Sequence, residues 1–455
     1  MKRLTYILLL VALALGFVGV GSASAQGTWN TGIDVQNLTG TAGTVTVEFY
    51  TSTGTSAGSL SDSIAAWGSL NYYLPSESVP PNGQYSAVVS SDVQVAATAS
   101  QANYELGGSD IYLGTANPEN MLSFPLVYRN HTSGKWNTKL IIQNASASVQ
   151  TVTLKLYSVG EAAPDATDTA QIQPYAAYTF DISASKYAAF GPYGSATVQG
   201  SAPLAGVADN IRNAGTGRLN VIETSYRAFG AAQRGRQIIA PLFYKNYNLW
   251  TTGVNVLNTG NIATTVTITY TGSNTSGSWV DHISLGANAM GSFYTPSNSN
   301  LPNNLYGSAQ IGSSATDIMV VVASQRYRTD GAYGVAYEGS LPSDATACVS
   351  LPVVHNRTTW KTGINIINWG STTANVTINY YSSAAGISNA TQSFTIPAKS
   401  PRTIYMPSDS PTALGFYGAA DVKSTNGQPL LINAAHSRMD QGVSSNFVGV
   451  NYTCP

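Results

Sequence analysis

A tract that begins with tryptophan and ends with asparagine occurs four times along this chain, and it constrains the fold more than any other feature. In each copy Thr follows the Trp by two residues, an apolar alternation comes next, and Asn closes the tract. The copies lie about 110 residues apart, which is the length of a small domain and well above the roughly 20–50 residues of a solenoid repeat. The chain therefore predicts tandem domains, marked by Trp29, Trp136, Trp250 and Trp360 and by Asn37, Asn144, Asn258 and Asn368.

The alternation inside each tract predicts a β-strand with one face in a core. In the second copy Trp136, Thr138, Leu140, Ile142 and Asn144 share one face, as the two-residue period of a strand requires. This register beside core residues favours a structural role for the tryptophan, as a plug at the edge of a core, over a role in ligand binding. We therefore interpret the tract as a fold signature.

Each copy carries further short strands, about seven in ~110 residues, which is typical of an antiparallel β-sandwich. The strand after the tract ends in tyrosine, as in residues 44–50 and 151–157. Turns rich in Gly, Ser, Thr and Asn separate the strands, and we find no convincing helical period after the first 25 residues. The predicted fold class is all-β, with four tandem antiparallel sandwiches at residues 26–121, 122–237, 238–347 and 348–455.

The first 25 residues predict a secretory signal peptide. Lys2 and Arg3 form a short positive segment, residues 7–20 form an apolar run, and a small-residue Ala-Ser-Ala cleavage site precedes Gln26. The alternative is an uncleaved membrane anchor, although the run is shorter than the ~20 apolar residues of a spanning helix. We expect cleavage, no membrane span afterwards, and a secreted or cell-surface protein.

The first copy departs from the other three at its start. Copies two to four open with a proline-centred strand, at residues 124–128, 240–244 and 351–355, whereas only Gly27 and Thr28 lie between Gln26 at the predicted cleavage site and Trp29. One interpretation assigns residues 124–128 to the end of the first copy, so that nothing is missing. The other is an incomplete sandwich whose exposed edge accepts a strand from another subunit.

Two cysteines, Cys348 and Cys454, lie at the first and last strands of the fourth copy. In an oxidising compartment a disulfide between them would tie the two ends of that domain together. Two free thiols are the alternative. A metal site is not expected, because no histidine lies near either cysteine in the sequence.

The Gly-Ile-x-Val-x-Asn tract, followed by a polar turn and Val-Thr-Val-x-x-Tyr, resembles the immunoglobulin-like repeats of bacterial surface proteins. The resemblance covers all four copies, and it implies immunoglobulin-like sandwiches with a role in adhesion or scaffolding. The partners would be other surface proteins or copies of this chain. Almost no linker joins the copies, which predicts a stiff rod or a compact array that provides several weak contacts at once.

Composition and residue spacing give no support for an enzyme, a cofactor or a nucleic-acid partner. Charged residues make up 9% of the chain and the formal net charge is −1, so a basic footprint for nucleic acid is missing. The histidines are scattered, and acidic residues such as Glu105, Glu223 and Asp440 fall at different positions of the repeat. We predict no catalytic and no metal-binding residue.

Aromatic residues remain as candidates for ligand contacts, because sugars stack on exposed aromatic faces. The four tryptophans of the tract are interpreted as core residues. The other three do not recur in register and are therefore better candidates for exposed contacts with a ligand: Trp67, Trp279 and Trp369. A structural or adhesive surface protein is our first functional prediction, and a carbohydrate-binding protein with a polysaccharide partner is the alternative.

Overall fold

The computed structural model describes residues 6–10, 29–105, 107–132, 136–213, 221–328, 331–438, 440 and 443–454. These residues form antiparallel strands, a one-turn helix α1 (Met406–Asp409) and the 3-10 turns η1 (Leu74–Ser76), η2 (Ser185–Tyr187), η3 (Ala231–Gln233), η4 (Thr295–Ser297) and η5 (Pro342–Asp344). The all-β prediction is thus confirmed. Among the described residues, no helix has the length and apolar character that crossing a membrane takes.

Four successive groups of strands, here called units one to four, follow the four tracts. Unit one contains β1 (Tyr6–Leu10), β2 (Asn30–Asn37), β3 (Gly43–Tyr50), β4 (Ser56–Ile64), β5 (Ser69–Tyr73), β6 (Ser86–Ser91), β7 (Val95–Asn103) and β8 (Gly108–Leu113). Unit two contains β9 (Glu119–Tyr128), β10 (Trp136–Asn144), β11 (Gln150–Ser158), β12 (Ala166–Ile172), β13 (Ala177–Asp181), β14 (Tyr193–Asn213) and β15 (Val221–Arg227).

Units three and four repeat this order of strands. Unit three contains β16 (Gln237–Tyr247), β17 (Trp250–Asn258), β18 (Thr264–Gly272), β19 (Ser278–Leu285), β20 (Met290–Tyr294), β21 (Leu305–Ser313), β22 (Ile318–Arg328) and β23 (Gly331–Glu338). Unit four contains β24 (Cys348–Asn356), β25 (Trp360–Asn368), β26 (Ala374–Ser382), β27 (Ala390–Ile396), β28 (Pro401–Tyr405), β29 (Phe416–Ser424), β30 (Leu430–Arg438), β31 (Val443–Val448) and β32 (Val450–Tyr452). The domain boundaries given above stay predictions.

Two layers of strands build each unit. In unit one the orders are β1-β6-β3-β4 and β5-β2-β7-β8, and the inward residues of both layers, such as Ile33, Val35, Val45 and Val47, pack in one core. The same pairings recur in the other units, except that the long strand β14 serves as both the sixth and the seventh strand of unit two. Alternation of buried and exposed residues therefore arises as expected for a sheet with one face in a core.

The strand order differs from that of an immunoglobulin domain. There the first, second, fourth and fifth strands form one sheet and the third, sixth and seventh form the other. Here the first strand pairs with the sixth, and the second pairs with the fifth and the seventh. The resemblance therefore extends to short alternating strands and not to their pairing, because the residue pattern records which face of a strand is buried and not which strand lies beside it.

The proline-centred strands open their own units. Residues 124–128 lie in β9, which pairs with β14 of unit two, so their assignment to the end of unit one does not hold. The strands β16 and β24 pair in the same way with β21 and β29. In unit one this position beside β6 is taken by β1, whose register runs from Tyr6 opposite Ser91 to Leu10 opposite Ala87. β1 lies within the predicted signal peptide.

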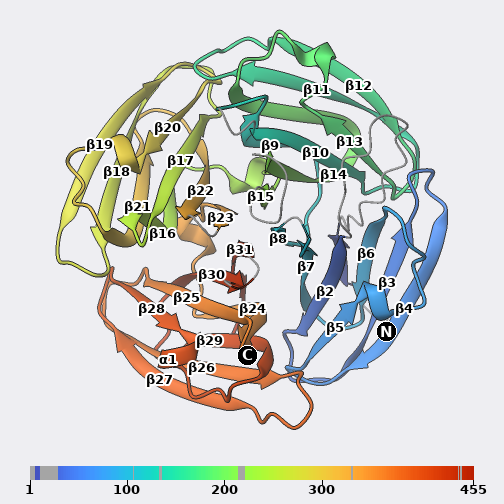
Figure 1. The fold of residues 1–455 in the computed structure, drawn as a ribbon, viewed down its shortest axis with the longest axis vertical. Coiled ribbons are helices and arrows are strands. Elements are labelled where there is room, and N and C mark those ends of the chain that lie inside the picture. Colours follow the sequence, from blue (N-terminus) through green and yellow to red (C-terminus); the bar gives the residue numbers. More distant parts are fainter. Residues whose placement is uncertain are drawn as a thin grey trace.

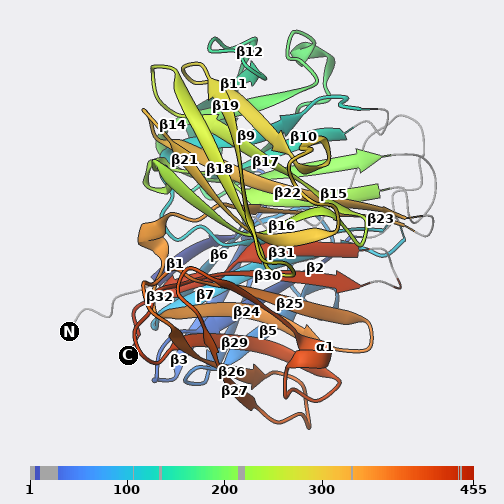
Figure 2. The ribbon, with the colours of Figure 1, turned by 90° about the vertical axis from the view of Figure 1, so that its left-hand side faces the viewer.

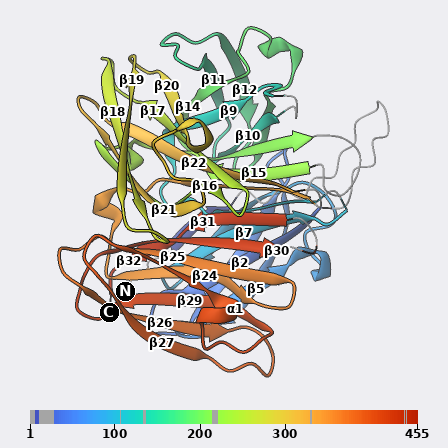
Figure 3. The same ribbon diagram turned by 60° about the vertical axis from the view of Figure 1, so that its left-hand side comes forward.

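The four units close into a ring around a common axis, as Figure 1 shows. The last main strand of each unit, β8, β15, β23 or β31, lies nearest to that axis and contacts its two neighbours of this set. Figures 2 and 3 show β15 and β31 of this set running along the axis. The arrangement is a compact array and not a rod.

Successive units meet at contacts here called joints, and at three of the four joints the opening strand of one unit lies against the outer face of the next. β9 contacts β17 and β22 at the 2–3 joint, and β16 contacts β25 and β30 at the 3–4 joint. β24 contacts β2 and β7 at the 4–1 joint, which closes the ring. Opening strands thus pair within their own unit and also form the surfaces that hold these three joints together.

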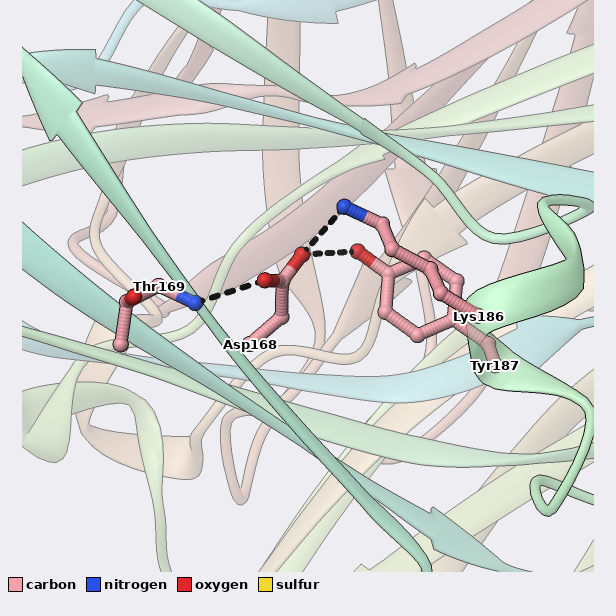
Figure 4. A network of polar contacts seen from close by, with 4 residues as sticks. All are labelled: Asp168, Thr169, Lys186 and Tyr187. Carbon is pink, nitrogen blue, oxygen red and sulfur yellow. Dashed lines mark hydrogen bonds and ion pairs between the residues drawn. The ribbon is translucent and has the colours of Figure 1, made fainter.

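A polar network fixes one turn of unit two to its outer sheet (Figure 4). Asp168 on β12 accepts hydrogen bonds from Lys186 Nζ at 2.7 Å and from the Tyr187 hydroxyl at 2.6 Å, both in η2. Burial alone would raise the pKa of Asp168, but these two hydrogen bonds, a third from the Thr169 N–H and the positive charge of Lys186 together lower it. The network therefore stabilises the turn with Asp168 ionised.

Candidate functional site

The asparagine of each tract has a structural role. The side chains of Asn37, Asn144, Asn258 and Asn368 are fully buried. In Asn368 the Nδ2 group donates to the carbonyl oxygens of Thr372, Ile396 and Pro397 at 2.7–3.1 Å, and Oδ1 accepts from Gly370 N at 2.9 Å. The other three asparagines make the same kind of contacts with the turns on either side of their strand.

A cavity of about 510 Å³ lies at the 2–3 joint. Unit two contributes an aromatic wall in which Tyr128 lies 5.5 Å from Trp136 and 5.2 Å from the stacked ring of His131, measured between ring centroids. Unit three contributes the opposite, more polar wall. The lining consists of Leu126, Tyr128, His131, Thr132, Trp136, Tyr193, Arg212, Thr224, Gly253, Asn255, Ser292, Tyr294, Ala323, Ser324 and Gln325.

A second cavity, of about 380 Å³, lies at the 4–1 joint. Its aromatic wall comes from unit four, where His355 stacks on Tyr417 with the ring centroids 5.5 Å apart and lies 5.8 Å from Trp360. Unit one supplies the polar wall. The lining consists of Asn30, Gly32, Asp34, Asn71, Tyr73, Ser100, Gln101, Ala102, Tyr104, Asp110, Ile111, Val353, His355, Arg357, Trp360 and Tyr417.

The two cavities, here called the 2–3 pocket and the 4–1 pocket, are built from the same positions of the repeat. The matched pairs on the aromatic wall are Tyr128 and His355, Trp136 and Trp360, and Tyr193 and Tyr417. On the polar wall they are Gly253 and Gly32, Asn255 and Asp34, Ser292 and Asn71, and Tyr294 and Tyr73. Both pockets therefore arise from the way one unit packs on the next.

Residues at the other two joints differ where the pockets would be. At the 3–4 joint Tyr247 packs against Tyr244 and Tyr306, with a centroid distance of 4.6 Å to the latter. At the 1–2 joint Lys139 stands where the other tracts carry glycine. Both joints thus differ from the pocket-forming ones by a bulky side chain at a matched or neighbouring position of the repeat.

Charged and neutral groups are arranged asymmetrically in the 4–1 pocket. Burial raises the pKa of Asp34 to about 6, although Asn71 Nδ2 and the Tyr417 hydroxyl donate to its Oδ1 at 2.8 and 3.1 Å. Burial, helped by the positive charge of Arg357, lowers the pKa of His355 to about 3. The pocket therefore offers a neutral imidazole, a guanidinium and a carboxyl that ionises near pH 6.

The tryptophans predicted as ligand contacts are half-buried and lie elsewhere. Trp67 packs beside Cys348 and Tyr452, where units four and one meet, and Trp369 packs on Ile239 and Ile367, where units three and four meet. Trp279, on the edge strand β19, packs on the core of unit three. None of these three is among the described residues that line the two pockets. The tract tryptophans Trp136 and Trp360 do line them, and the register within one copy gave no sign of it.

The cysteines form a disulfide between Cys348, the first residue of β24, and Cys454. The strand β32 pairs with the start of β24, so the C-terminal segment lies against the opening strand of unit four. Cys348 also packs with Leu38 and Ala96 of unit one. The disulfide therefore lies beside the joint that closes the ring.

Three acidic side chains that are far apart in the sequence meet near the axis. Carboxylate oxygens of Asp110 on β8, Asp209 on β14 and Glu223 on β15 lie within 4.8 Å of one another, and all three residues are buried. Sequence reasoning considered Glu223 alone and treated acidic residues as dispersed. The closed ring brings unit one against unit two and thereby assembles the group, here called the acid cluster.

The fold and its pockets define a class of protein: a closed array of β-sandwich units with aromatic cavities between neighbours. No family model matches the chain, and no curated protein matches it. The Thermotoga maritima protein 1070 is 12% identical, with 23% of this chain and 92% of that one covered and a TM-score of 0.21.

The chain is also similar, over 90% of its own length and 92% of the other, to a tetra-tandem repeat in the extending region of a large adhesion protein, at 14% identity and a TM-score of 0.11. TM-scores this low establish no shared fold for either structure. Function is therefore argued from the residues of this chain.

Proposed function

We propose that this chain is an exported adhesive protein that binds saccharides in the 2–3 and 4–1 pockets. The observation that carries this proposal is the repeated construction of the two pockets, with an aromatic wall opposite a polar one. Aromatic faces suit the apolar C–H surface of a sugar ring, and amide, carboxylate and guanidinium groups suit its hydroxyls. Export is supported by the predicted signal peptide and by the disulfide.

The size of the pockets and their chemistry suit small oligosaccharides. Cavities of about 510 and 380 Å³ fall in the ~300–1,000 Å³ range of small-molecule sites. In the 4–1 pocket Asp34 and Asn71 provide hydrogen-bonding groups opposite the ring of Trp360. We assign the pocket a binding role without catalysis.

Two pockets on one rigid ring would provide avidity. The 2–3 and 4–1 joints alternate with the other two around the ring, so the pockets lie on opposite sides of the axis. A surface that displays many copies of one glycan can engage both, and the second contact then forms at a high effective concentration. Adhesion through individually weak sites follows from this arrangement.

The test is glycan-array and polysaccharide pull-down binding by the mature protein, which starts near Gln26. Tyr73 in the 4–1 pocket and Tyr294 in the 2–3 pocket are 45% and 46% exposed, so their replacement by alanine should leave folding intact. We expect Tyr73→Ala with Tyr294→Ala to weaken binding at least about tenfold, which corresponds to one lost stacking contact of about 1.4 kcal/mol.

Tyr405 provides a matched control for these variants. It ends β28 as Tyr73 ends β5 and Tyr294 ends β20, and it is 41% exposed, but it lines neither pocket. Tyr405→Ala should bind as the unmodified protein does. If Trp279→Ala loses binding and the protein with both Tyr73→Ala and Tyr294→Ala keeps it, the ligand binds at the tryptophans that do not recur in the repeat and not in the pockets. Absence of any glycan binding would contradict the proposal.

A second candidate function, self-assembly by strand complementation, is favoured by a separate observation. In unit two the Tyr226 hydroxyl accepts a hydrogen bond from Leu126 N and donates to Leu126 O, at 3.1 and 2.6 Å, where the proline-centred strand bulges. Tyr337 bonds Leu242 of unit three in the same way. Unit one carries the matching Tyr112 on β8, although its mature sequence would lack a proline-centred strand.

Removal of the signal peptide would empty the place of β1 beside β6 and leave that edge open to an opening strand from another copy. Light scattering and negative-stain imaging of the mature protein over a range of concentrations test this. We expect assembly that a Phe-Pro-Leu-Val-Tyr peptide inhibits and that a peptide with Pro replaced by Ala inhibits less. A monomer at all concentrations, or an assembly indifferent to the peptide, would contradict complementation.

A further inference from the structure

The acid cluster lies at the 1–2 joint, between two units and next to the ring axis. Asp110 comes from unit one, and Asp209 and Glu223 come from neighbouring strands of unit two. Their exposed fractions are 4%, 3% and 2%. Burying three carboxyl groups together is costly unless hydrogen bonds, protons or a cation satisfy them.

Few donors face these carboxyl groups: Ser225 interacts with Asp110, and Asp209 and Glu223 interact with each other. Asp110 Oδ1, Asp209 Oδ1 and both oxygens of Glu223 have no hydrogen-bond partner among the described residues. A neutral side chain adds an independent sign of a missing partner. Asn446 on β31 lines the same narrow crevice as Asp110 and Glu223, is 3% exposed, and has no partner for either Oδ1 or Nδ2.

The charge balance at the cluster fits a divalent ion. The positive charge of Lys139 acts on both Asp209 and Glu223, so one lysine stands against three carboxyl groups. Full ionisation would leave two negative charges in a buried site. Carboxylate and amide oxygens are hard ligands, which suit Ca²⁺ or Mg²⁺ rather than a transition metal.

The burial of the site favours calcium over magnesium. One oxygen from each carboxyl group lies within 4.8 Å of the others, which is compatible with Ca–O distances of about 2.4 Å. Mg²⁺ retains several waters and requires near-ideal octahedral geometry. We propose that Asp110, Asp209 and Glu223 bind Ca²⁺, and that the ion clamps unit one to unit two.

The 1–2 joint, where the acid cluster lies, differs from the other three joints in what holds it together. Opening strands of the mature chain hold the 2–3, 3–4 and 4–1 joints. At the 1–2 joint β8 contacts β15, and Ile141 and Val207 of unit two pack against the core of unit one. The residues that match Asp110 on the other axial strands are Thr224, Val335 and Ser445, so the acidic site is confined to this joint. A bound cation would add to the packing that holds unit one against unit two.

Calorimetric titration and thermal unfolding of the mature protein, first dialysed against a chelator at pH 7.5, test the proposal. We expect one Ca²⁺ per chain and a rise in Tm of about 2–4 °C at saturating Ca²⁺, with a smaller rise for Mg²⁺. Glu223→Gln should abolish the rise and the heat of binding. In metal-free protein this variant should unfold at the same temperature or higher, because it removes one of the buried acidic groups.

Two further variants make the result decisive. Asp209→Asn should behave as Glu223→Gln does, and it serves if that variant fails to fold. Asp421→Asn removes a buried carboxyl that the Tyr452 hydroxyl satisfies in unit four, and it should keep the full Ca²⁺ response. No response in the unmodified protein, or an equal response in Glu223→Gln, would overturn the proposal and leave protons as the partners of the cluster. Asp209 and Glu223 line neither saccharide pocket, whereas Asp110 also lines the 4–1 pocket. The variants are therefore made at Asp209 and Glu223, and saccharide binding is measured separately in each.

Discussion

The side chain of the asparagine that closes each tract donates to turns on both sides of its strand. Asn368 Nδ2 binds carbonyl oxygens of Thr372, Ile396 and Pro397, which are parts of two different turns around the core of unit four. Because buried backbone carbonyls need a donor, this one residue replaces hydrogen bonds that no strand supplies. Sequence alternation placed the asparagine in the core, but its partners depend on the turns.

Asn368→Ala should lower the free energy of unfolding by at least about 2 kcal/mol, because several buried carbonyl groups lose their donor. Asn368→Asp should be nearly as harmful, since an ionised carboxylate accepts hydrogen bonds and donates none. Denaturant titration measures both. The exposed Asn300 provides the control, and Asn300→Ala should change little. Tolerance of Asn368→Asp would contradict this account.

Asp34 makes the stability of the 4–1 joint depend on pH. Burial raises its folded pKa to about 6, above the unfolded value near 3.8, so the folded state holds the extra proton between these values. Stability from this group therefore falls as the pH rises from about 4 to about 6, by up to about 3 kcal/mol.

The difference in unfolding free energy between the unmodified protein and Asp34→Asn isolates this effect from the buried histidines, which act in the opposite direction. From pH 4 to pH 7 we expect the unmodified protein to lose unfolding free energy relative to Asp34→Asn. Parallel pH profiles for the two proteins would mean that Asp34 is ionised throughout this range.

The tract tryptophans show what a single copy of the repeat can and cannot reveal. Trp136 packs with Ile222 and Tyr128, apart from the main core of unit two, and the role of the tract tryptophans at the edge of a core stays a prediction. Trp136 and Trp360 also face the next unit and line its pocket, and no pattern within one copy records what a neighbouring copy presents. Trp67, Trp279 and Trp369 are predicted as ligand contacts because they do not recur, and this criterion also carries no information about the neighbouring copy.

At the scale of strands, the opening strand depends on a tyrosine of the last main strand. Proline interrupts the ladder between β9 and β14, and the register shifts there. The Tyr226 hydroxyl then bonds both polar groups of Leu126. A bulge in a buried strand is acceptable only when such a partner exists.

Tyr226→Phe should therefore destabilise unit two by about 1–3 kcal/mol, because Leu126 keeps a buried N–H and C=O without partners. Tyr270 offers a matched control, since its hydroxyl is buried without a hydrogen-bond partner among the described residues. Tyr270→Phe should be neutral or stabilising. Thermal unfolding with hydrogen exchange at β9 distinguishes the two, and equal effects would argue against the role of the Tyr226 hydroxyl.

Strand existence followed from the sequence, whereas strand pairing did not. The two-residue period located β2, β10, β17 and β25 and the tyrosine-ended strands after them. The first strand pairs with the sixth across the unit, a contact decided by how whole sheets pack. A resemblance to immunoglobulin repeats thus predicted the right class of structure with a different order of strands.

At the scale of the whole molecule, ring closure depends on the angle at which each opening strand packs on the next unit. Short connections between units permitted a rod as well as a compact array, and residue patterns do not fix that angle. Closure brings together groups that lie far apart in sequence, among them Asp110 with Glu223 and Arg438 with Tyr104, whose ring lies 4.6 Å from the guanidinium. Sequence reasoning that treated the acidic residues as belonging to separate domains could not find the cluster.

The disulfide should stabilise ring closure more than it stabilises any other joint. Cys348 begins the strand β24 that covers β2 and β7, and it packs with Leu38 and Ala96 of unit one. Replacing both cysteines by serine should lower the free energy of unfolding by about 2–4 kcal/mol, because the unfolded fourth unit gains conformational freedom.

Because the lost constraint is local, hydrogen exchange should accelerate in β2, β7 and β24 while β17 and β22 at the 2–3 joint remain protected. Saccharide binding in the 4–1 pocket should weaken, and binding in the 2–3 pocket should persist. The two pockets are measured separately by adding Tyr294→Ala, which impairs the 2–3 pocket, or Tyr73→Ala, which impairs the 4–1 pocket. Uniform acceleration at all four joints would mean instead that the ring opens as a single cooperative body.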